Sequence, residues 1–310
     1  MSDNTNMLDA VKAAEDFMDN RDPDQVMALL MPYAQQGLQG RGLWLVARAI
    51  TMGGDPREAI ALYRGAFKQD PKLPFIDVRM NDIEMRLSDV EGSKSIVDFA
   101  DELYQDIYEL EKMDLQSGDV FIDVGANIGF VSLFVAKKYP AAKVFGFEPA
   151  PGTFNAFENN IALNDIRNVT AINKAVNGDG RDLELLIMPG DSGASNAFGT
   201  KEVVDRFTKD MGATVVSVSA ITIDQAFEKY GISKCKVLKL DCEGAEYEVL
   251  RNTDVLEKID HIVMELHINS NEVKSTTPEA FRDSFINEIS NRVANPPVIR
   301  VATMVGVLQS

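Results

Sequence analysis

The first 74 residues carry apolar side chains at helical spacing almost without interruption. Apolar positions recur every three or four residues, and glycine or Asp-Pro breaks separate the segments. This pattern predicts helices over residues 8–19, 23–36, 38–52 and 55–69. We therefore expect a small all-α domain at residues 1–74.

The last of these segments has a recognisable pattern of small residues. GDPREAIALYRGAFKQDP resembles the second helix of a tetratricopeptide repeat, with Ala59, Tyr63 and Ala66 on one face and Pro71 after it. Two helical pairs are fewer than the three repeats that a free-standing solenoid needs. Two roles stay open for this tetratricopeptide-like domain: a helical cap without binding function, or a contact surface for a homodimer or protein partner.

The pattern changes at residue 75. Apolar and polar residues alternate on both sides of Asn81-Asp82, which predicts a hairpin, and an amphipathic helix follows over residues 95–110. From residue 119, short apolar strands alternate with helices. This order predicts an α/β domain at residues 75–310, with a Rossmann-like, doubly wound and mostly parallel sheet. Ligands of such sheets bind at the carboxyl ends of the strands.

Composition narrows the classes of partner. The chain has 48 acidic and 31 basic residues, for a net charge of −17. This balance argues against nucleic acid and against anionic membranes as partners. There is no apolar run of about 18 residues, no recognisable signal peptide and no disulfide-like cysteine pattern. We expect a soluble cytoplasmic protein that acts on a small-molecule or saccharide substrate.

The loop DVGANIGF follows the first strand of the α/β domain. It departs from a dinucleotide-binding fingerprint because Asn127 and Phe130 occupy positions that need glycine. Asp123, Glu148 and Asp241 each end a strand, and three carboxylates at one edge repel a phosphate chain. They suit a cationic cofactor with a ribose, because an acid such as Glu148 accepts hydrogen bonds from ribose hydroxyls. S-adenosyl-L-methionine has these properties.

Four segments in order resemble one family. FIDVGANIGFVSLFVA, FGFEPAPGTFNAFENNIALN, VTAINKAVNGDG and KLDCEGAEYEVL are similar to the FkbM family of S-adenosylmethionine-dependent methyltransferases, over roughly residues 75–268. The resemblance implies a class I methyltransferase fold and O-methylation of a sugar, glycan or secondary metabolite. The alternative function is a helical-repeat interaction protein with an inactive methyltransferase-like domain.

The resemblance also assigns cofactor-binding positions. It places the ribose at Glu148 and the adenine near Asn173 and Ala175. The methionine part of the cofactor is expected at the glycine loop, around Asp123, Gly125, Ala126, Asn127 and Gly129.

Methylation of a hydroxyl requires a general base or a metal ion. His267 closes a strand, and Glu265 lies on the same face of that strand because side chains alternate. Asp241 ends the preceding strand. In one interpretation His267 is the base and Glu265 or Asp241 orients it. In another, Asp241, Glu265 and His267 bind Mg²⁺ or Mn²⁺. In a third, His267 only packs or caps.

Further polar candidates flank this edge. Lys239 either pairs with a neighbouring acid or contacts the reacting oxygen. The loop at residues 189–200 is rich in glycine and serine, and Ser195 and Asn196 are its candidates for substrate binding. Glu243 belongs either to the substrate site or to the start of the next helix.

Glu246 and Glu248 are the remaining acids of KLDCEGAEYEVL. We expect Glu246 to lie in the first turn of a helix, where the dipole favours an anion. Glu248 is expected on a solvated helix face.

Overall fold

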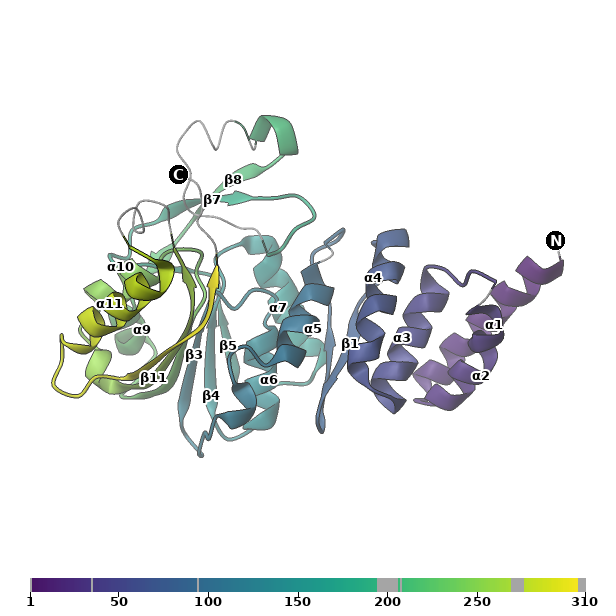
Figure 1. Ribbon diagram of the computed structural model, residues 1–310, viewed down its shortest axis with the longest axis horizontal. Helices are drawn as coiled ribbons and strands as arrows, with labels where there is room; N and C mark the ends of the chain where they lie inside the picture. The colour runs from purple at the N-terminus through teal and green to yellow at the C-terminus, as the bar shows by residue number, and fades with distance from the viewer. Residues whose placement is uncertain are drawn as a thin grey trace. The chain divides into compact units, whose positions relative to one another are not determined.

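This computed structural model of the chain describes residues 2–34, 36–93, 95–193, 206, 208–268 and 276–305. The chain divides into two compact units, Met1–Gln105 and Asp106–Ser310. Each unit is described by itself below, and Figure 1 labels many of the helices and strands of both.

The N-terminal unit begins with helices that pack in succession, each on the next. Helix α3 has many buried residues, among them Trp44, Leu45 and Ala49. The four expected helical segments are confirmed, and the tetratricopeptide-like character of the region stays a prediction. The elements are α1 (Ser2–Asp19), α2 (Pro23–Ala34), α3 (Arg41–Gly53), η1 (Pro56–Glu58) and α4 (Ala59–Gln69).

A hairpin and a fifth helix complete this unit. Strands β1 (Ile76–Met80) and β2 (Ile83–Leu87) pair in antiparallel fashion around Asn81, whose positive φ of 54° forms the turn. Strand β1 contacts both α3 and α5 (Ser95–Gln105) because its buried residues need a helical layer on each side. The compact unit therefore extends to Gln105, beyond the expected domain boundary at residue 74.

A buried ion pair joins the hairpin to α3. Arg48 Nε lies 2.6 Å from Asp77 Oδ2, and Arg86 Nε donates to Asp77 Oδ1 at 2.9 Å. The Arg48 guanidinium also lies over the rings of Trp44 and Phe75, at 4.6 and 4.8 Å from their centroids. Both charges of the Arg48–Asp77 pair are thus buried and paired with each other. This pair fixes the position of β1 against α3.

The C-terminal unit is built on a parallel sheet. The strand order is β12-β11-β10-β3-β4-β5, and each neighbouring pair runs parallel. The order reverses between β3 and β10, so the carboxyl ends of these strands face the point where such sheets bind ligands. The expected doubly wound fold is confirmed. The strands are β3 (Val120–Val124), β4 (Lys143–Phe147), β5 (Val169–Ile172), β10 (Cys235–Leu240), β11 (Ile259–His267) and β12 (Val298–Val305).

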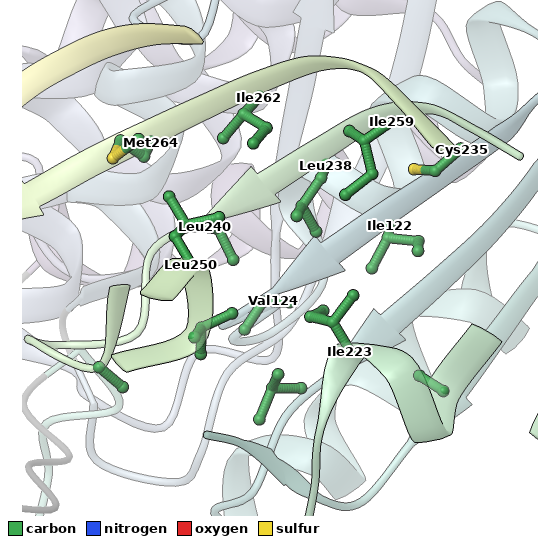
Figure 2. Close-up of a cluster of buried hydrophobic side chains, with 14 of the residues drawn as sticks. Ile122, Val124, Ile223, Cys235, Leu238, Leu240, Leu250, Ile259, Ile262 and Met264 are labelled. Atoms are coloured by element: carbon green, nitrogen blue, oxygen red, sulfur yellow. The ribbon is translucent and has the colours of Figure 1, made fainter. Parts of the chain in front are cut away.

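Helices cover both faces of this sheet (Figure 1). On one face, Ile122, Leu238 and Ile262 from the strands pack with Ile223 and Leu250 from the helices (Figure 2). Because side chains alternate along a strand, the residues between these apolar positions point to the opposite face. The helices of the first face are α9 (Ile223–Lys229), α10 (Glu246–Asn252) and α11 (Pro278–Ser290), and those of the second are α6 (Phe130–Lys138) and α7 (Pro151–Leu163).

The strand expected at residues 169–176 is divided in two. Its first part is β5, whereas β6 (Ala175–Val176) leaves the main sheet and pairs with β9 (Ala220–Ile221). Beside them, β7 (Leu183–Ile187) and β8 (Thr214–Val218) form an antiparallel hairpin. Among the described residues, none of the helices is long and apolar enough to cross a membrane.

The buried Arg48–Asp77 pair should stabilise the N-terminal unit. Asp77→Asn leaves Arg48 buried without its counter-charge, so the free energy of unfolding should fall by roughly 3–5 kcal/mol. Trp44 is the single tryptophan of the chain and contacts Arg48, so urea unfolding followed by its fluorescence reports on this unit. Glu84→Gln breaks the exposed Arg21–Glu84 pair and should cost less than about 1 kcal/mol. Equal small losses in both variants would contradict the prediction.

Candidate active site

The glycine loop after β3 is in close contact with the residue that follows β10. Gly125 has a φ of +73°, and a Cβ at this position would lie 1.7 Å from the carbonyl oxygen of Asp241. The Asp241 amide in turn donates to the Val124 carbonyl at 3.1 Å. Only glycine fits here, because both the backbone conformation and the space exclude a side chain.

The amides of this loop are used within the protein. Those of Gly125 and Ala126 both donate to the Phe147 carbonyl, at 3.0 and 2.9 Å. The Asn127 amide donates to Glu148 Oε2 at 3.0 Å. Phosphate-binding loops instead direct their backbone N–H groups at the anion. The loop therefore suits a cofactor without phosphate, as the sequence predicted. The next two amides, of Ile128 and Gly129, donate to Asn127 Oδ1 and the Ala126 carbonyl.

Glu148 follows the end of β4 and is buried. Its two oxygens accept from the amides of Asn127 and Ala150, and each keeps lone pairs for a further donor. Burial raises the pKa of Glu148 to about 7, against the opposing effect of these hydrogen bonds and of Lys239. A buried carboxylate with spare acceptor capacity is the group that a ribose hydroxyl requires.

The two residues expected near the adenine have different environments. The Asn173 side chain donates to the carbonyls of Glu148 and Pro149, at 2.9 and 3.0 Å, and so fixes the turn after β4. Ala175 is buried in β6. Asn173 thus contacts the backbone of Glu148, and the contact of Asn173 and Ala175 with a cofactor stays a prediction.

Lys239 lies at the centre of a charged cluster, with only 1% of its side chain exposed. Its ammonium is 2.9 Å from the Gly125 carbonyl, 3.1 Å from Asp123 Oδ1 and 3.4 Å from Asp241 Oδ2. It also lies 5.2 Å from the centroid of the Tyr108 ring. Of the two roles open from the sequence, pairing with neighbouring acids is the one that this geometry shows.

Asp123 lies beneath the glycine loop. Its side chain is fully buried on the face of the sheet that α6 covers, where Oδ2 accepts from the Ser132 hydroxyl at 2.7 Å. The other oxygen faces Lys239. Asp123 thus lies beneath the loop and pairs with Lys239, and its contact with a cofactor stays a prediction.

Tyr108 is a site residue that the sequence did not indicate. Its hydroxyl lies 3.0 Å from Asp241 Oδ2 and 3.4 Å from Glu265 Oε2. Arg300 holds the segment by donating to the Tyr108 carbonyl. Because 133 positions separate Tyr108 from Asp241, no local spacing could have revealed this contact.

His267 is held between two glutamates. Its Nδ1 lies 3.1 Å from Glu246 Oε1, and its Nε2 lies 3.7 Å from Glu243 Oε2. Burial lowers the pKa of His267, but the hydrogen bond to Glu246 and the charges of Glu246, Glu243 and Asp241 outweigh this effect and raise it to about 9. His267 is thus cationic near neutral pH. The expectation that Asp241 or Glu265 orients it was wrong, because Glu246 occupies that place.

Glu246 is fully buried and organises the loop after β10. Its Oε1 accepts from the amides of Cys242 and Gly244, at 2.9 and 3.2 Å, in addition to His267. Glu243 lies in the same loop with a positive φ of 55° and 32% of its side chain exposed. Burial raises the pKa of Glu243 to about 7. His267 lowers this pKa, and the neighbouring acids Asp241, Glu246 and Glu265 raise it.

The metal site expected at Asp241, Glu265 and His267 does not form. Within the described part of the chain, no group of three or more His, Cys, Asp or Glu residues is arranged to hold a metal ion. The reason is that Asp241 and Glu265 approach Tyr108, whereas His267 turns to Glu246 and Glu243. The substrate candidates Ser195 and Asn196 lie outside the described residues.

Comparison with known proteins decides the family. Residues 123–289, just over half of the chain, match the model of the family described as "Methyltransferase FkbM domain". The chain belongs to the FkbM methyltransferase family. It is therefore an S-adenosylmethionine-dependent methyltransferase, and the matched residues all lie in the C-terminal unit.

Three curated relatives match this FkbM-type domain. Methyltransferase sdnD of Sordaria araneosa is 31% identical over 176 residues, which cover 49% of this chain and 68% of sdnD. The 31-O-demethyl-FK506 methyltransferase FkbM of Streptomyces tacrolimicus is 30% identical, covering 53% of this chain and 74% of that protein. The hexuronic acid methyltransferase AglP of Haloferax volcanii is 29% identical, covering 53% and 62%.

The residues of the site fit the cofactor of this family. The inward-facing amides of the glycine loop leave no phosphate cradle, and Glu148 keeps acceptor capacity for hydroxyl donors. Glu148 and the loop Gly125–Gly129 would hold S-adenosyl-L-methionine.

The close approach of Gly125 to Asp241 predicts a site-specific loss of cofactor binding. Gly125→Ala should abolish binding of S-adenosylhomocysteine in calorimetry, because the new methyl group collides with the Asp241 carbonyl. Gly118→Ala is the matched control: its φ of +86° is equally unfavourable, but the space around it is open. The control should cost roughly 1–2 kcal/mol of stability and keep binding. Intact binding in Gly125→Ala would contradict this geometry.

The buried carboxyl of Glu148 predicts pH-dependent cofactor affinity. Protonation removes an acceptor, so affinity for S-adenosylhomocysteine should fall as pH decreases through about 7. Glu148→Gln should bind roughly 10- to 100-fold more weakly at pH 8, the range of a charged hydrogen bond, and should lose this part of the pH dependence.

Calorimetry of wild type and Glu148→Gln from pH 6 to 8.5 measures both effects. The difference between the two proteins removes the ligand's own titration. The exposed Glu158→Gln on α7 is the control and should follow the wild type. Parallel pH curves for wild type and Glu148→Gln would exclude Glu148 as the titrating group.

Proposed function

We propose that this FkbM-family protein transfers a methyl group to a hydroxyl of a sugar, glycan or secondary metabolite. Two relatives support this acceptor class by their names, one a hexuronic acid methyltransferase and the other a 31-O-demethyl-FK506 methyltransferase. The observation that carries the proposal is a partly exposed carboxyl, Glu243, in the loop after β10. This loop begins at Asp241, whose carbonyl contacts the glycine loop.

A side chain of the protein must accept the proton of the acceptor hydroxyl, because an alcohol is a poor nucleophile until it loses that proton. When bound, S-adenosyl-L-methionine supplies a methyl group on a positively charged sulfur. As the acceptor oxygen takes up this methyl group from the sulfur, the hydroxyl proton would pass to a carboxylate oxygen of Glu243. No metal ion is required in this scheme, since Glu243 performs the deprotonation.

Glu243 is better placed for this step than His267. The exposed fraction of its side chain is 32%, compared with 5% for His267, so an acceptor reaches the carboxyl first. A pKa near 7 suits a base working at neutral pH, whereas the imidazolium of His267 has no lone pair to offer. His267, oriented by Glu246, instead favours the anionic form of Glu243.

Asp241 and Glu265 have a supporting part in this proposal. Asp241 is partly exposed, but Lys239 and Tyr108 both engage its Oδ2. Glu265 lies on the other side of the Tyr108 hydroxyl. These two acids hold Tyr108 in place and line the edge on which an acceptor is oriented.

The proposal predicts the effect of Glu243→Gln. The variant should lower kcat by about 10²- to 10⁴-fold, the usual contribution of a general base, and leave S-adenosylhomocysteine binding unchanged. Glu248→Gln, a half-buried position on α10, should keep the wild-type rate. Product is measured by mass spectrometry after incubation with S-adenosyl-L-methionine and panels of saccharides and hydroxylated natural products.

Two results would overturn parts of this proposal. Methyl transfer found only on nitrogen, carbon or sulfur would exclude the O-methyltransferase function. A Glu243→Gln rate within threefold of wild type, together with a large loss in His267→Gln, would move the base to His267.

A further inference from the structure

We propose that Lys239 is a positioning residue that fixes the cofactor loop and the acceptor-side loop in one arrangement. The proposal rests on the cofactor of the FkbM family and does not depend on the identity of the acceptor. It goes beyond charge neutralisation, because the ammonium connects two loops that approach the ligands from different strands.

Strand register creates this connection. Lys239 of β10 lies directly opposite Asp123 of β3, and both side chains point to the same face of the sheet. Two residues further along each strand come Gly125 and Asp241. The Lys239 side chain therefore extends beneath the start of both loops at once.

Lys239 interacts with three oxygen atoms around it. Its ammonium donates a hydrogen bond to the Gly125 carbonyl and forms ion pairs with Asp123 Oδ1 and Asp241 Oδ2. Two of these acceptors belong to the β3 side and one to the β10 side. The Tyr108 ring covers the ammonium and contacts Asp241 through its hydroxyl.

The contact with the Gly125 carbonyl has a specific consequence. Because this carbonyl points to Lys239 while the Gly125 amide points to Phe147, the peptide groups on either side of Gly125 are both fixed. The same ammonium restrains the carboxylate of Asp241, which contacts Gly125 through its backbone. Loss of Lys239 should thus release the glycine loop and the loop at residues 241–245 together.

A simple substitution does not separate positioning from folding. Lys239→Met leaves Asp123 fully buried without a counter-charge, and this alone is enough to destabilise the fold. The double variant Lys239→Met/Asp123→Asn removes both buried charges and restores a neutral interior. Lys236→Met is the control, since Lys236 lies on the same strand but pairs with Asp260.

The double variant should fold and yet bind S-adenosylhomocysteine at least tenfold more weakly than wild type in calorimetry. In the absence of ligand, amide hydrogen exchange should increase in peptides covering residues 125–129 and 241–245 in parallel, with little change elsewhere. Lys236→Met should match the wild type in both measurements.

Recovery of wild-type affinity and exchange in the folded double variant would show that Lys239 only neutralises Asp123, and would overturn the proposal. Increased exchange in one loop without the other would also overturn it, because the inferred connection would be absent. Neither measurement uses an acceptor. A failure of the O-methylation proposal would therefore leave this test intact, and the reverse also holds.

Discussion

The pairing of β3 with β10 is the constraint on which the C-terminal unit depends. At this pair the strand order reverses, and its register sets Lys239 opposite Asp123. Apolar residues of the two strands occupy one face and form the core with α9, α10 and α11. On the opposite face, the buried apolar residues Phe121 and Val237 are followed by Asp123 and Lys239, which lie nearest the ligand-binding edge.

Burial of acids at this edge is possible because each one has a defined donor. Asp123 has Ser132 and Lys239, Glu148 has two backbone amides, and Glu246 has two amides and His267. The more exposed acid, Glu243, has no comparable set of short contacts and keeps a pKa near neutrality. Within the loop after β10, Glu246 thus organises the backbone, whereas Glu243 is the proposed base.

Much of this organisation could be predicted from local pattern. Strand–helix alternation predicted the parallel sheet, and Asn127 and Phe130 excluded a dinucleotide fingerprint before any contact was known. The predicted contacts of the site were wrong where the interacting residues are distant in sequence. His267 was expected to meet Asp241 or Glu265 because strand alternation puts them on one face. The turn at Glu243 and Gly244 instead brings Glu246 back to the imidazole.

Tyr108 and the extent of the N-terminal unit were beyond sequence reasoning for a similar reason. No periodicity marks a tyrosine that reaches a carboxylate through tertiary packing alone. Likewise, the hairpin at β1 and β2 resembles the start of a sheet domain, but the buried Arg48–Asp77 pair and the hydrogen bond from Arg79 to the Thr51 carbonyl join it to α3.

The glycine loop has a consequence for how this scaffold could change its ligand. Five consecutive amides, from Gly125 to Gly129, already have acceptors inside the protein. A phosphate-bearing nucleotide would have to break several of these bonds, so side-chain substitutions at the edge would not convert the site. Such a conversion would need a rebuilt backbone path between β3 and α6.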